Sequence, residues 1–205
     1  MKVIDYRLRT DDGQAIRFVR SPHVGGQIAP RFIVIHYTGG QSAEAAIAWM
    51  TDPKSKASAH LVVGRDGSVA QLVPFDRQAY HTGPSQWKGI SGIARYSLGI
   101  ELDNPGPLSE IGGRWKATFG KVYGNEQVLR ASHKNGGSFT AWHTYTSVQI
   151  GVAVAVARAI IREYRIEEIL GHDDISPGRK WDPGPAFPLE QFRERAFAQT
   201  EQQDS

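Results

Sequence analysis

The stretch RFIVIHYTGG, residues 31–40, decides the fold. Its β-branched and aromatic residues form a short apolar run that ends at Thr38-Gly39-Gly40, which predicts a buried strand over 31–37 with His36 at its carboxyl end. After the turn, Ser42 can cap an alanine-rich helix, SAEAAIAWMTD, which has an acidic residue in its first turn and stops before Pro53. A strand, a turn and a helix in this order predict an α/β domain.

Further strands are expected on both sides of this unit. Residues 60–64 and 68–73 flank Arg65-Asp66-Gly67, which predicts a hairpin with Asp-Gly at its turn. The run SLGIEL, 97–102, is closed by Asn104-Pro105-Gly106 and predicts another strand, and the apolar run before His172 resembles one too. We therefore predict a single α/β domain with a central mixed β-sheet flanked by helices.

The remaining segments set the expected boundaries. Thr146 to Gln149 has the pattern of a capping box and opens a long core helix that reaches Tyr164, and a short amphipathic helix is expected over 189–197. Residues 105–138 are rich in glycine and polar groups, which favours a long excursion over regular core. We divide the chain into an N-terminal extension at 1–20, a main domain at 21–197, whose site we expect at the strand ends in a surface groove, and a flexible tail at 198–205.

Composition excludes several classes of protein. The 24 basic and 21 acidic side chains are interleaved and give a net charge of only +3, which argues against a nucleic-acid partner. The absence of cysteine removes thiolate chemistry, so any metal must sit on histidines and carboxylates. The first twenty residues carry eight charges, which is untypical of a secretory signal and predicts a cytoplasmic location, with release by a signal-independent route left open. No apolar run is long enough for membrane insertion.

Two of the seven histidines stand out. His36 and His172 both follow strand-like apolar runs and precede turns, and sites in α/β sheets collect at such strand ends. Asp182 lies ten residues beyond His172 in a loop rich in proline and glycine, which could fold its carboxylate back toward the imidazole. Two imidazoles and one carboxylate suit zinc with an open fourth position, although spacing alone leaves the site undecided because no short two-histidine motif is present.

Three charged residues have both a functional and an ordinary interpretation. Glu101 lies in an apolar strand, where an acid is costly unless it is paired, outward-facing or functional. The alternation of the strand is also compatible with a solvent-facing position for Glu101. Arg179 and Lys180, in PGRKWD, could equally be solvated loop charges.

The segments IVIHYTGG, SAHLVVGRDGSVAQLVPFDRQAYHTG, SLGIELDNPG and GHDDISPGRKWDPGPAFP resemble the motif series of the zinc-dependent N-acetylmuramoyl-L-alanine amidases, a family that includes peptidoglycan recognition proteins. The match runs in order from Phe32 to Phe187, about three quarters of the chain. An aspartate where many relatives have a cysteine ligand makes the chain most similar to the AmpD-like branch. Ala59 stands where phage members have a catalytic tyrosine, and the AmpD-like branch reads SAH there too.

The resemblance implies a role for each motif residue. His36, His172 and Asp182 match the zinc ligands, Glu101 matches an acid that carries a proton from water to the departing nitrogen, and Lys180 matches a group that stabilises the oxyanion. The substrate groove would be lined by the following residues: His60, His81, Trp87, Asn104 and Arg179, with Trp142 and His143 as further candidates. The implied reaction is hydrolysis of the amide between N-acetylmuramic acid, or its 1,6-anhydro form, and L-alanine in peptidoglycan or muropeptides.

Alternatives remain open at this point. A non-catalytic peptidoglycan recognition module would share the fold, although such modules typically lack the third ligand, which this chain has at Asp182. A general zinc peptidase would use the same ligands. Muropeptide recycling and a phage-type lysin role are both compatible with the sequence, other divalent metals could replace zinc in vitro, and the sequence does not predict an oligomeric state.

Overall fold

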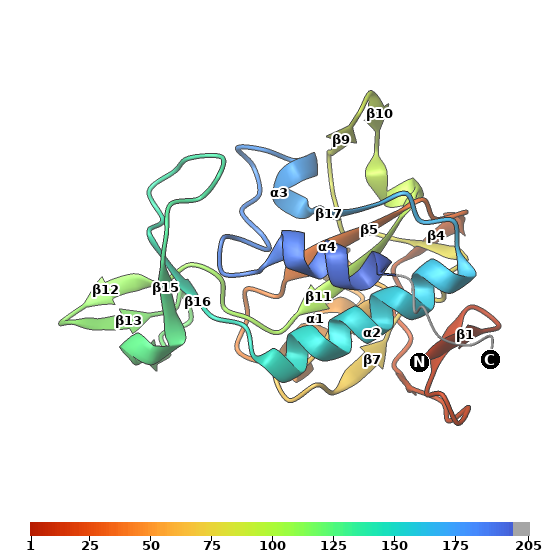
Figure 1. Cartoon of the computed structure of the whole chain (residues 1–205), viewed down its shortest axis with the longest axis horizontal. Coiled ribbons are helices and arrows are strands. Elements are labelled where there is room, and N and C mark those ends of the chain that lie inside the picture. The colour runs from red at the N-terminus through yellow and green to blue at the C-terminus, as the bar shows by residue number, and fades with distance from the viewer. Residues whose placement is uncertain (199–205) are drawn as a thin grey trace.

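A six-stranded mixed sheet forms the centre of the protein in the computed structural model, which describes residues 1–198 (Figure 1). Four neighbouring strands are parallel, β7 is antiparallel to β6, and β3 is parallel to β7 at the edge. In spatial order the strands are β17 (Glu168–Gly171), β5 (Phe32–Tyr37), β11 (Ser97–Leu102), β6 (Leu61–Val63), β7 (Val69–Gln71) and β3 (Arg17–Phe18). The predicted central mixed sheet in one α/β domain is confirmed.

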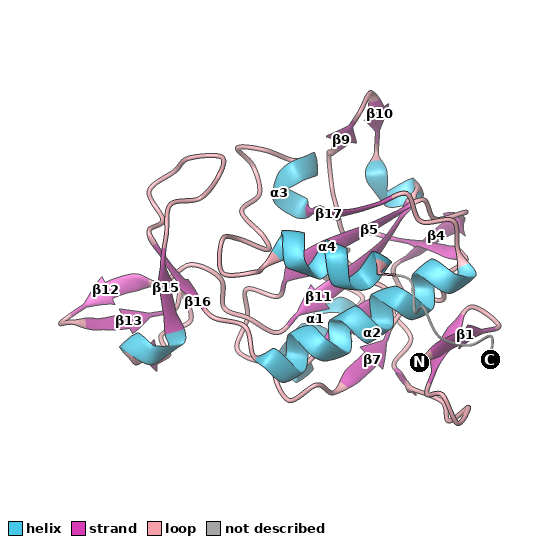
Figure 2. Cartoon of the chain, in the orientation of Figure 1, coloured by secondary structure: helices cyan, strands magenta, loops and turns pink. Residues whose placement is uncertain are grey.

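Helices cover both faces of this sheet. Helices α2 (Ser147–Glu163) and α4 (Leu189–Phe197) pack side by side across one face (Figure 2), where Ile33 and Ile35 of β5 join the largest buried apolar cluster. Helix α1 (Ala43–Thr51) packs on the other face through Ile47 and Met50. Because β5 is buried on both sides, its sequence is an unbroken apolar run instead of an alternating one.

The helix starts follow the expected caps, with one difference. Ser42 Oγ accepts a hydrogen bond from Ala45 N at 3.2 Å, and Thr146 Oγ1 accepts one from Gln149 N at 3.0 Å. The expected capping box at 146–149 is half formed, because the Gln149 amide donates to the carbonyls of Val63 and Asp103 instead of returning to the cap. Gln149 thus ties α2 to the ends of β6 and β11.

The segment after β11 is more ordered than the sequence indicates. Residues 105–145 leave the main sheet and build small antiparallel sheets around a separate apolar cluster that includes Trp115 and Tyr123. Strands of two or three residues show no detectable alternation, which explains why the sequence predicts only an excursion here. Its elements are β12 (Ser109–Ile111), β13 (Arg114–Lys116), β14 (Val122–Tyr123), η2 (Asn125–Gln127), β15 (Val128–Arg130) and β16 (Ala141–His143).

The two ends of the chain were predicted to lie outside the main domain, and this division stays a prediction. Strand β3 lies within the predicted extension at 1–20 and pairs with β7 of the main sheet, while residues 199–205 of the predicted tail lie outside the described residues. No helix within residues 1–198 is long and apolar enough to cross a membrane. The remaining elements are β1 (Lys2–Ile4), β2 (Arg7–Arg9), β4 (Val24–Gln27), β8 (Arg77–Ala79), β9 (Gln86–Trp87), β10 (Ile90–Ser91), η1 (Ile93–Arg95) and α3 (His172–Ile175).

Candidate functional site

The carboxyl ends of three neighbouring parallel strands bring the key side chains together. Glu101 of β11 lies opposite His36 of β5, and β17 pairs with β5 up to Gly171 opposite Ile35, so His172 follows at the level of His36. Strand alternation turns His36 away from the face that holds Ile33 and Ile35. The sheet register therefore sets three polar side chains at one edge, as the sequence predicts for His36 and His172.

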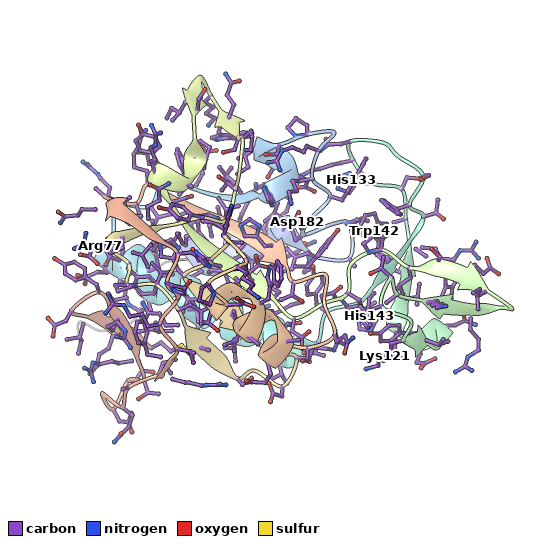
Figure 3. All side chains as sticks on the ribbon, turned by 180° about the vertical axis from the view of Figure 1, so that it is seen from behind. Arg77, Lys121, His133, Trp142, His143 and Asp182 are labelled. Carbon is purple, nitrogen blue, oxygen red and sulfur yellow. The ribbon has the colours of Figure 1, made fainter. Side chains whose placement is uncertain are left out.

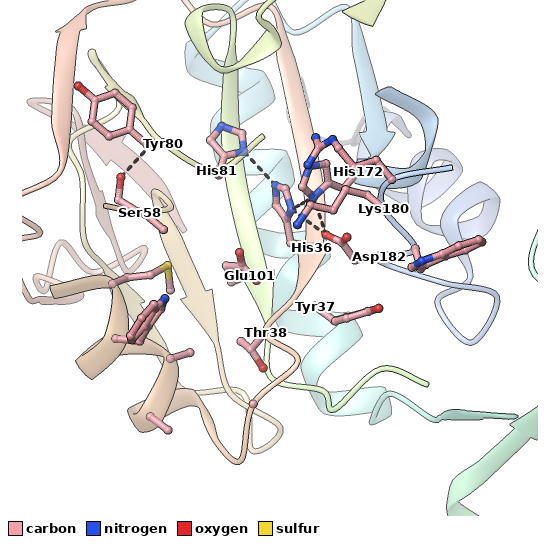
Figure 4. A pocket seen from close by; sticks show the side chains of 18 residues that line it. His36, Tyr37, Thr38, Ser58, Tyr80, His81, Glu101, His172, Lys180 and Asp182 are labelled. Carbon is pink, nitrogen blue, oxygen red and sulfur yellow. Dashed lines mark hydrogen bonds and ion pairs between the residues drawn. The ribbon is translucent and has the colours of Figure 1, made fainter. Parts of the chain in front are cut away.

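Asp182 reaches this edge from the loop after α3. Its backbone carbonyl accepts a hydrogen bond from Asp173 N at 2.8 Å, which folds the loop back beside His172. His36 Nδ1, His172 Nδ1 and Asp182 Oδ2 are then mutually separated by 2.9 Å, and all three residues are buried (Figure 4). These three residues form a group with the composition and spacing to hold a metal ion.

The hydrogen-bond chemistry of the cluster fits a cation. His172 Nε2 is 2.9 Å from the Thr82 carbonyl oxygen, which can only accept, so a neutral His172 carries its hydrogen there and leaves a lone pair on Nδ1. That lone pair faces a carboxylate oxygen, an arrangement that repels unless a proton or a metal lies between them. Tetrahedral zinc with bonds of roughly 2.0–2.1 Å would require the three atoms to move apart by only a few tenths of an ångström.

Burial and charge shift the pKa values of the cluster in opposite directions. Burial, with the neighbouring charge of His172, lowers the pKa of His36 to about 4, which favours the neutral imidazole that metals bind. Burial alone would raise the pKa of Asp182, but its hydrogen bonds to His172 and His36 outweigh this and hold the pKa below its usual range. At neutral pH the His36 imidazole is therefore neutral and the Asp182 carboxylate is ionised.

Glu101 lies beside the cluster as an acid without a partner. Its Oε2 is buried and has no hydrogen-bond partner within residues 1–198. Burial, together with the negative charge of Asp182, raises the pKa of Glu101 well above its usual range, while the charge of Lys180 works in the other direction. Glu101 thus points away from the α2 face, as the alternation predicts, but that face is a pocket wall and not open solvent at this position.

A pocket of about 490 Å³ lies over the cluster and is lined by Glu101, His81, Arg179 and Lys180, all of which were predicted site residues. Arg179 Nη2 is also bonded to the carbonyls of Thr82 and Pro84, so part of its guanidinium holds the neighbouring loop. Further lining residues that the sequence did not single out include Trp49, Tyr80 and Trp181. Helical spacing places Trp49 on the outer side of α1, but no local signal indicates that this side faces the pocket.

Three other predicted groove residues do not line this pocket in the described part of the chain. His60 is buried below it and bonded to the Arg77 carbonyl and to Gly99 N. Trp87 donates to Glu168 from the β9–β10 hairpin. Asn104 is buried in a turn, where it bonds the His143 carbonyl and Gly106 N, so its role in substrate binding stays a prediction, as do those of His60 and Trp87.

The excursion reaches the loop that carries Asp182. His133 Nε2 is 2.9 Å from Asp173 Oδ2 and 3.2 Å from the Trp181 carbonyl oxygen, and Figure 3 shows His133 and Trp142 on the side of the molecule that holds Asp182. Tyr145 Oη donates to the Pro183 carbonyl at 2.8 Å. Trp142 is buried beside the same loop, since a Cβ on Gly184 would lie 2.8 Å from its ring, and its indole donates to the Ala131 carbonyl.

His60 makes the stability of the protein sensitive to acid. Burial lowers the pKa of His60 from 6.5 to about 4, so below pH 6.5 the unfolded chain binds a proton that the folded protein does not. Stability should therefore fall between pH 6.5 and about 4, by on the order of 3 kcal/mol from this group. Urea unfolding of wild type and His60→Gln at pH 7 and pH 5 measures this, and equal pH dependence in the two proteins would contradict it.

An α/β fold with a buried His-His-Asp cluster and an adjacent acid in one pocket has the groups that a hydrolytic enzyme with a metal centre uses. The chain belongs to the N-acetylmuramoyl-L-alanine amidase family, whose profile matches residues 26–185.

The chain is similar to several characterised members of this family. The 1,6-anhydro-N-acetylmuramyl-L-alanine amidase AmpD of Escherichia coli is 30% identical over 199 residues, covering 86% of this chain and 90% of that protein. The crystal structure of AmpD as its selenomethionine derivative superimposes with a TM-score of 0.63 at 26% identity over 95% of this chain and 99% of the other. The amidase AmiD of E. coli, in complex with the substrate anhydro-N-acetylmuramic acid-L-Ala-D-γ-Glu-L-Lys, gives a TM-score of 0.61 at 27% identity over 86% and 60%.

Proposed function

We propose that this protein is a zinc-dependent amidase that hydrolyses the bond between N-acetylmuramic acid, or its 1,6-anhydro form, and L-alanine. The observation that carries the proposal is the triangle of His36, His172 and Asp182 at the floor of the pocket, with Glu101 beside it. The named activities of AmpD and AmiD support the choice of substrate.

The three clustered residues would hold the metal through two imidazole nitrogens and one carboxylate oxygen. A bound zinc ion supplies Lewis acidity, which polarises an amide carbonyl and acidifies water. The single negative charge of Asp182 leaves a net positive site that favours an oxygen anion. Cobalt or manganese could occupy the same ligands in vitro.

Glu101 and Lys180 would handle the proton and the developing charge. Glu101 lies opposite His36 in the sheet register and lines the same pocket, so we place it where water and the amide nitrogen would meet. We assign it the transfer of a proton from water to the departing nitrogen. Lys180 lines the same pocket and would donate to the oxyanion.

The pocket is lined by both aromatic and basic side chains, which suggests how a muropeptide lies in it. Trp49 and Tyr80 are aromatic residues with 58% and 43% of their surface exposed, and Arg179 and Lys180 are basic residues. Aromatic faces suit the apolar face of a sugar ring, and basic groups suit the carboxylates of a stem peptide. We place the glycan toward Trp49 and the peptide toward Arg179.

Trp49→Ala should raise KM about tenfold and leave kcat nearly unchanged, because an exposed indole contributes to binding of substrate and transition state alike. Steady-state kinetics with soluble anhydro-muropeptide measures this. Tyr6→Ala, which removes another exposed aromatic that does not line the pocket, is the matched control. A loss of kcat at constant KM in Trp49→Ala would contradict a binding role.

The activity test uses two substrates, intact sacculi and soluble anhydro-muropeptide, with products identified by mass spectrometry. Cleavage that stops with a chelator, returns with zinc and releases a peptide with a free L-alanine amine supports the amidase. Binding of muropeptide without cleavage by the zinc-loaded protein would favour a recognition module, and cleavage of peptides without muramic acid would favour a general peptidase. The preferred substrate separates recycling from lysis, and the cytoplasmic location stays a prediction.

A further inference from the structure

The two ring nitrogens of His36 face different surroundings. Nδ1 points into the cluster with His172 and Asp182, whereas Nε2 is 2.9 Å from His81 Nδ1 (Figure 4). A neutral imidazole carries its hydrogen on one nitrogen and a lone pair on the other. Since a metal binds the lone pair, His36 can serve as an Nδ1 ligand only when its hydrogen sits on Nε2.

A chain of contacts leading away from the cluster fixes where that hydrogen goes. At its outer end, Ser97 Oγ is 2.8 Å from the Ile93 carbonyl oxygen, which can only accept, so the Ser97 hydroxyl donates there. Ser97 Oγ is also 3.3 Å from His81 Nε2. With its own hydrogen already used, Ser97 accepts from His81 at this contact, which places the His81 hydrogen on Nε2.

The position of the hydrogen on His81 then determines which nitrogen of His36 carries its hydrogen. His81 has its hydrogen on Nε2 and therefore a lone pair on Nδ1, which accepts from His36 Nε2. We propose that His81 is a positioning residue that holds His36 in the Nε2–H form and so turns the Nδ1 lone pair toward the metal position. In this assignment each ring nitrogen of His81 is already engaged within the protein, one with His36 and one with Ser97.

The fold is built to keep His81 in this orientation. Gly99 of β11 lies directly under the ring, and a Cβ there would be 2.6 Å from His81 Cγ. The ring of His60 meets His81 edge-on, with centroids 5.8 Å apart and planes at 79°. The next residue, Thr82, accepts the Nε2 hydrogen of His172 through its carbonyl. Residues 81 and 82 thus orient both histidines of the cluster, one through a side chain and one through the backbone.

The inference rests on the proposed metal-dependent function, and it predicts an effect on metal affinity that can be measured without turnover. Partners that orient a metal-binding histidine typically contribute on the order of 10- to 100-fold in metal affinity. His81→Ala should therefore weaken zinc binding, measured by competition with a chromophoric chelator, by about that factor. His81→Asn should restore much of it, because its amide oxygen can take the acceptor position of Nδ1.

Two further variants complete the design. Ser97→Ala removes the outer end of the chain and should give a smaller loss of affinity than His81→Ala. His23→Ala serves as the control, because His23 is bonded to the Asp52 carbonyl and takes no part in the hydrogen bonds that link Ser97, His81 and His36. Equal zinc affinity in wild type, His81→Ala and Ser97→Ala would overturn the inference. Failure of wild type itself to bind zinc would instead overturn the proposed function, so the two failures are distinguishable.

Long-range nitrogen–proton NMR of the zinc-loaded protein tests the assignment directly. We expect the ring hydrogens of His36, His81 and His172 on Nε2, and a changed ratio of forms for His36 in His81→Ala. In cobalt-substituted protein, the visible absorption band of His81→Ala should shift and that of His81→Asn should return toward wild type. A hydrogen on Nδ1 of His81 in the wild type would refute the proposed chain.

Discussion

Asp182→Ala is expected to lose bound zinc and to reduce the rate of amide hydrolysis by about a thousandfold or more. The carboxylate supplies the single negative charge of the cluster, and its Oδ2 lies 2.9 Å from both Nδ1 atoms. Without it, two neutral imidazoles must hold a dication in a buried site. Metal catalysis contributes several kcal/mol to such reactions, and each 1.36 kcal/mol is tenfold in rate. Metal analysis and mass-spectrometric product assays measure the two losses separately.

A neighbouring carboxylate provides the matched control. Asp173 is buried in α3, just before the loop that carries Asp182, but it pairs with His133 and Lys134 and is not part of the cluster. Asp173→Asn keeps an oxygen that can accept from His133, so we expect it to retain zinc. If Asp182→Ala kept a full equivalent of zinc with unchanged affinity, the assignment of Asp182 as a ligand would be wrong.

The sequence predicts those elements whose signals are local. The strand over 97–102 and the helix over 189–197 have the predicted bounds, and the caps at Ser42 and Thr146 begin α1 and α2. These features depend on alternation, helical periodicity and a hydroxyl that accepts from a backbone amide, all of which lie within a few residues. The proximity of His36 and His172 could also be predicted from the sequence, because the carboxyl ends of parallel strands lie at one edge of the sheet.

Long-range packing accounts for what the sequence leaves out. Trp49 and Tyr80 come from separate segments, and neither carries a local sign that it faces the pocket of Asp182. The link between His81 and Ser97 is a side-chain contact between residues sixteen positions apart, and no motif encodes it. The contact between residues 105–145 and the Asp182 loop could not be predicted either. It depends on His133, whose partner Asp173 lies forty residues away in the sequence. Such contacts follow from the assembled fold and not from any single segment.

Glu101→Gln is expected to lower kcat by roughly a hundredfold to ten-thousandfold while zinc content and KM stay close to wild type. General acid–base groups contribute on this scale, and the amide has the same shape but cannot carry the proton. The buried, unpartnered Oε2 and the position opposite His36 support this role. Glu44→Gln is the matched control and should have normal kinetics. It alters an exposed acid of α1 that pairs with Arg17 of β3.

The pH profile separates a proton carrier from a residue that merely fills the pocket wall. Burial and Asp182 raise the pKa of Glu101, and Lys180 counteracts them. A bound dication adds positive charge beside Glu101 and draws its pKa back toward the ordinary range, so the carboxylate becomes available to accept a proton as pH rises. Wild-type kcat should therefore climb through an acidic limb that Glu101→Gln lacks. An unchanged limb in the variant would assign it to another group, and a kcat within twofold of wild type would leave Glu101 a structural residue.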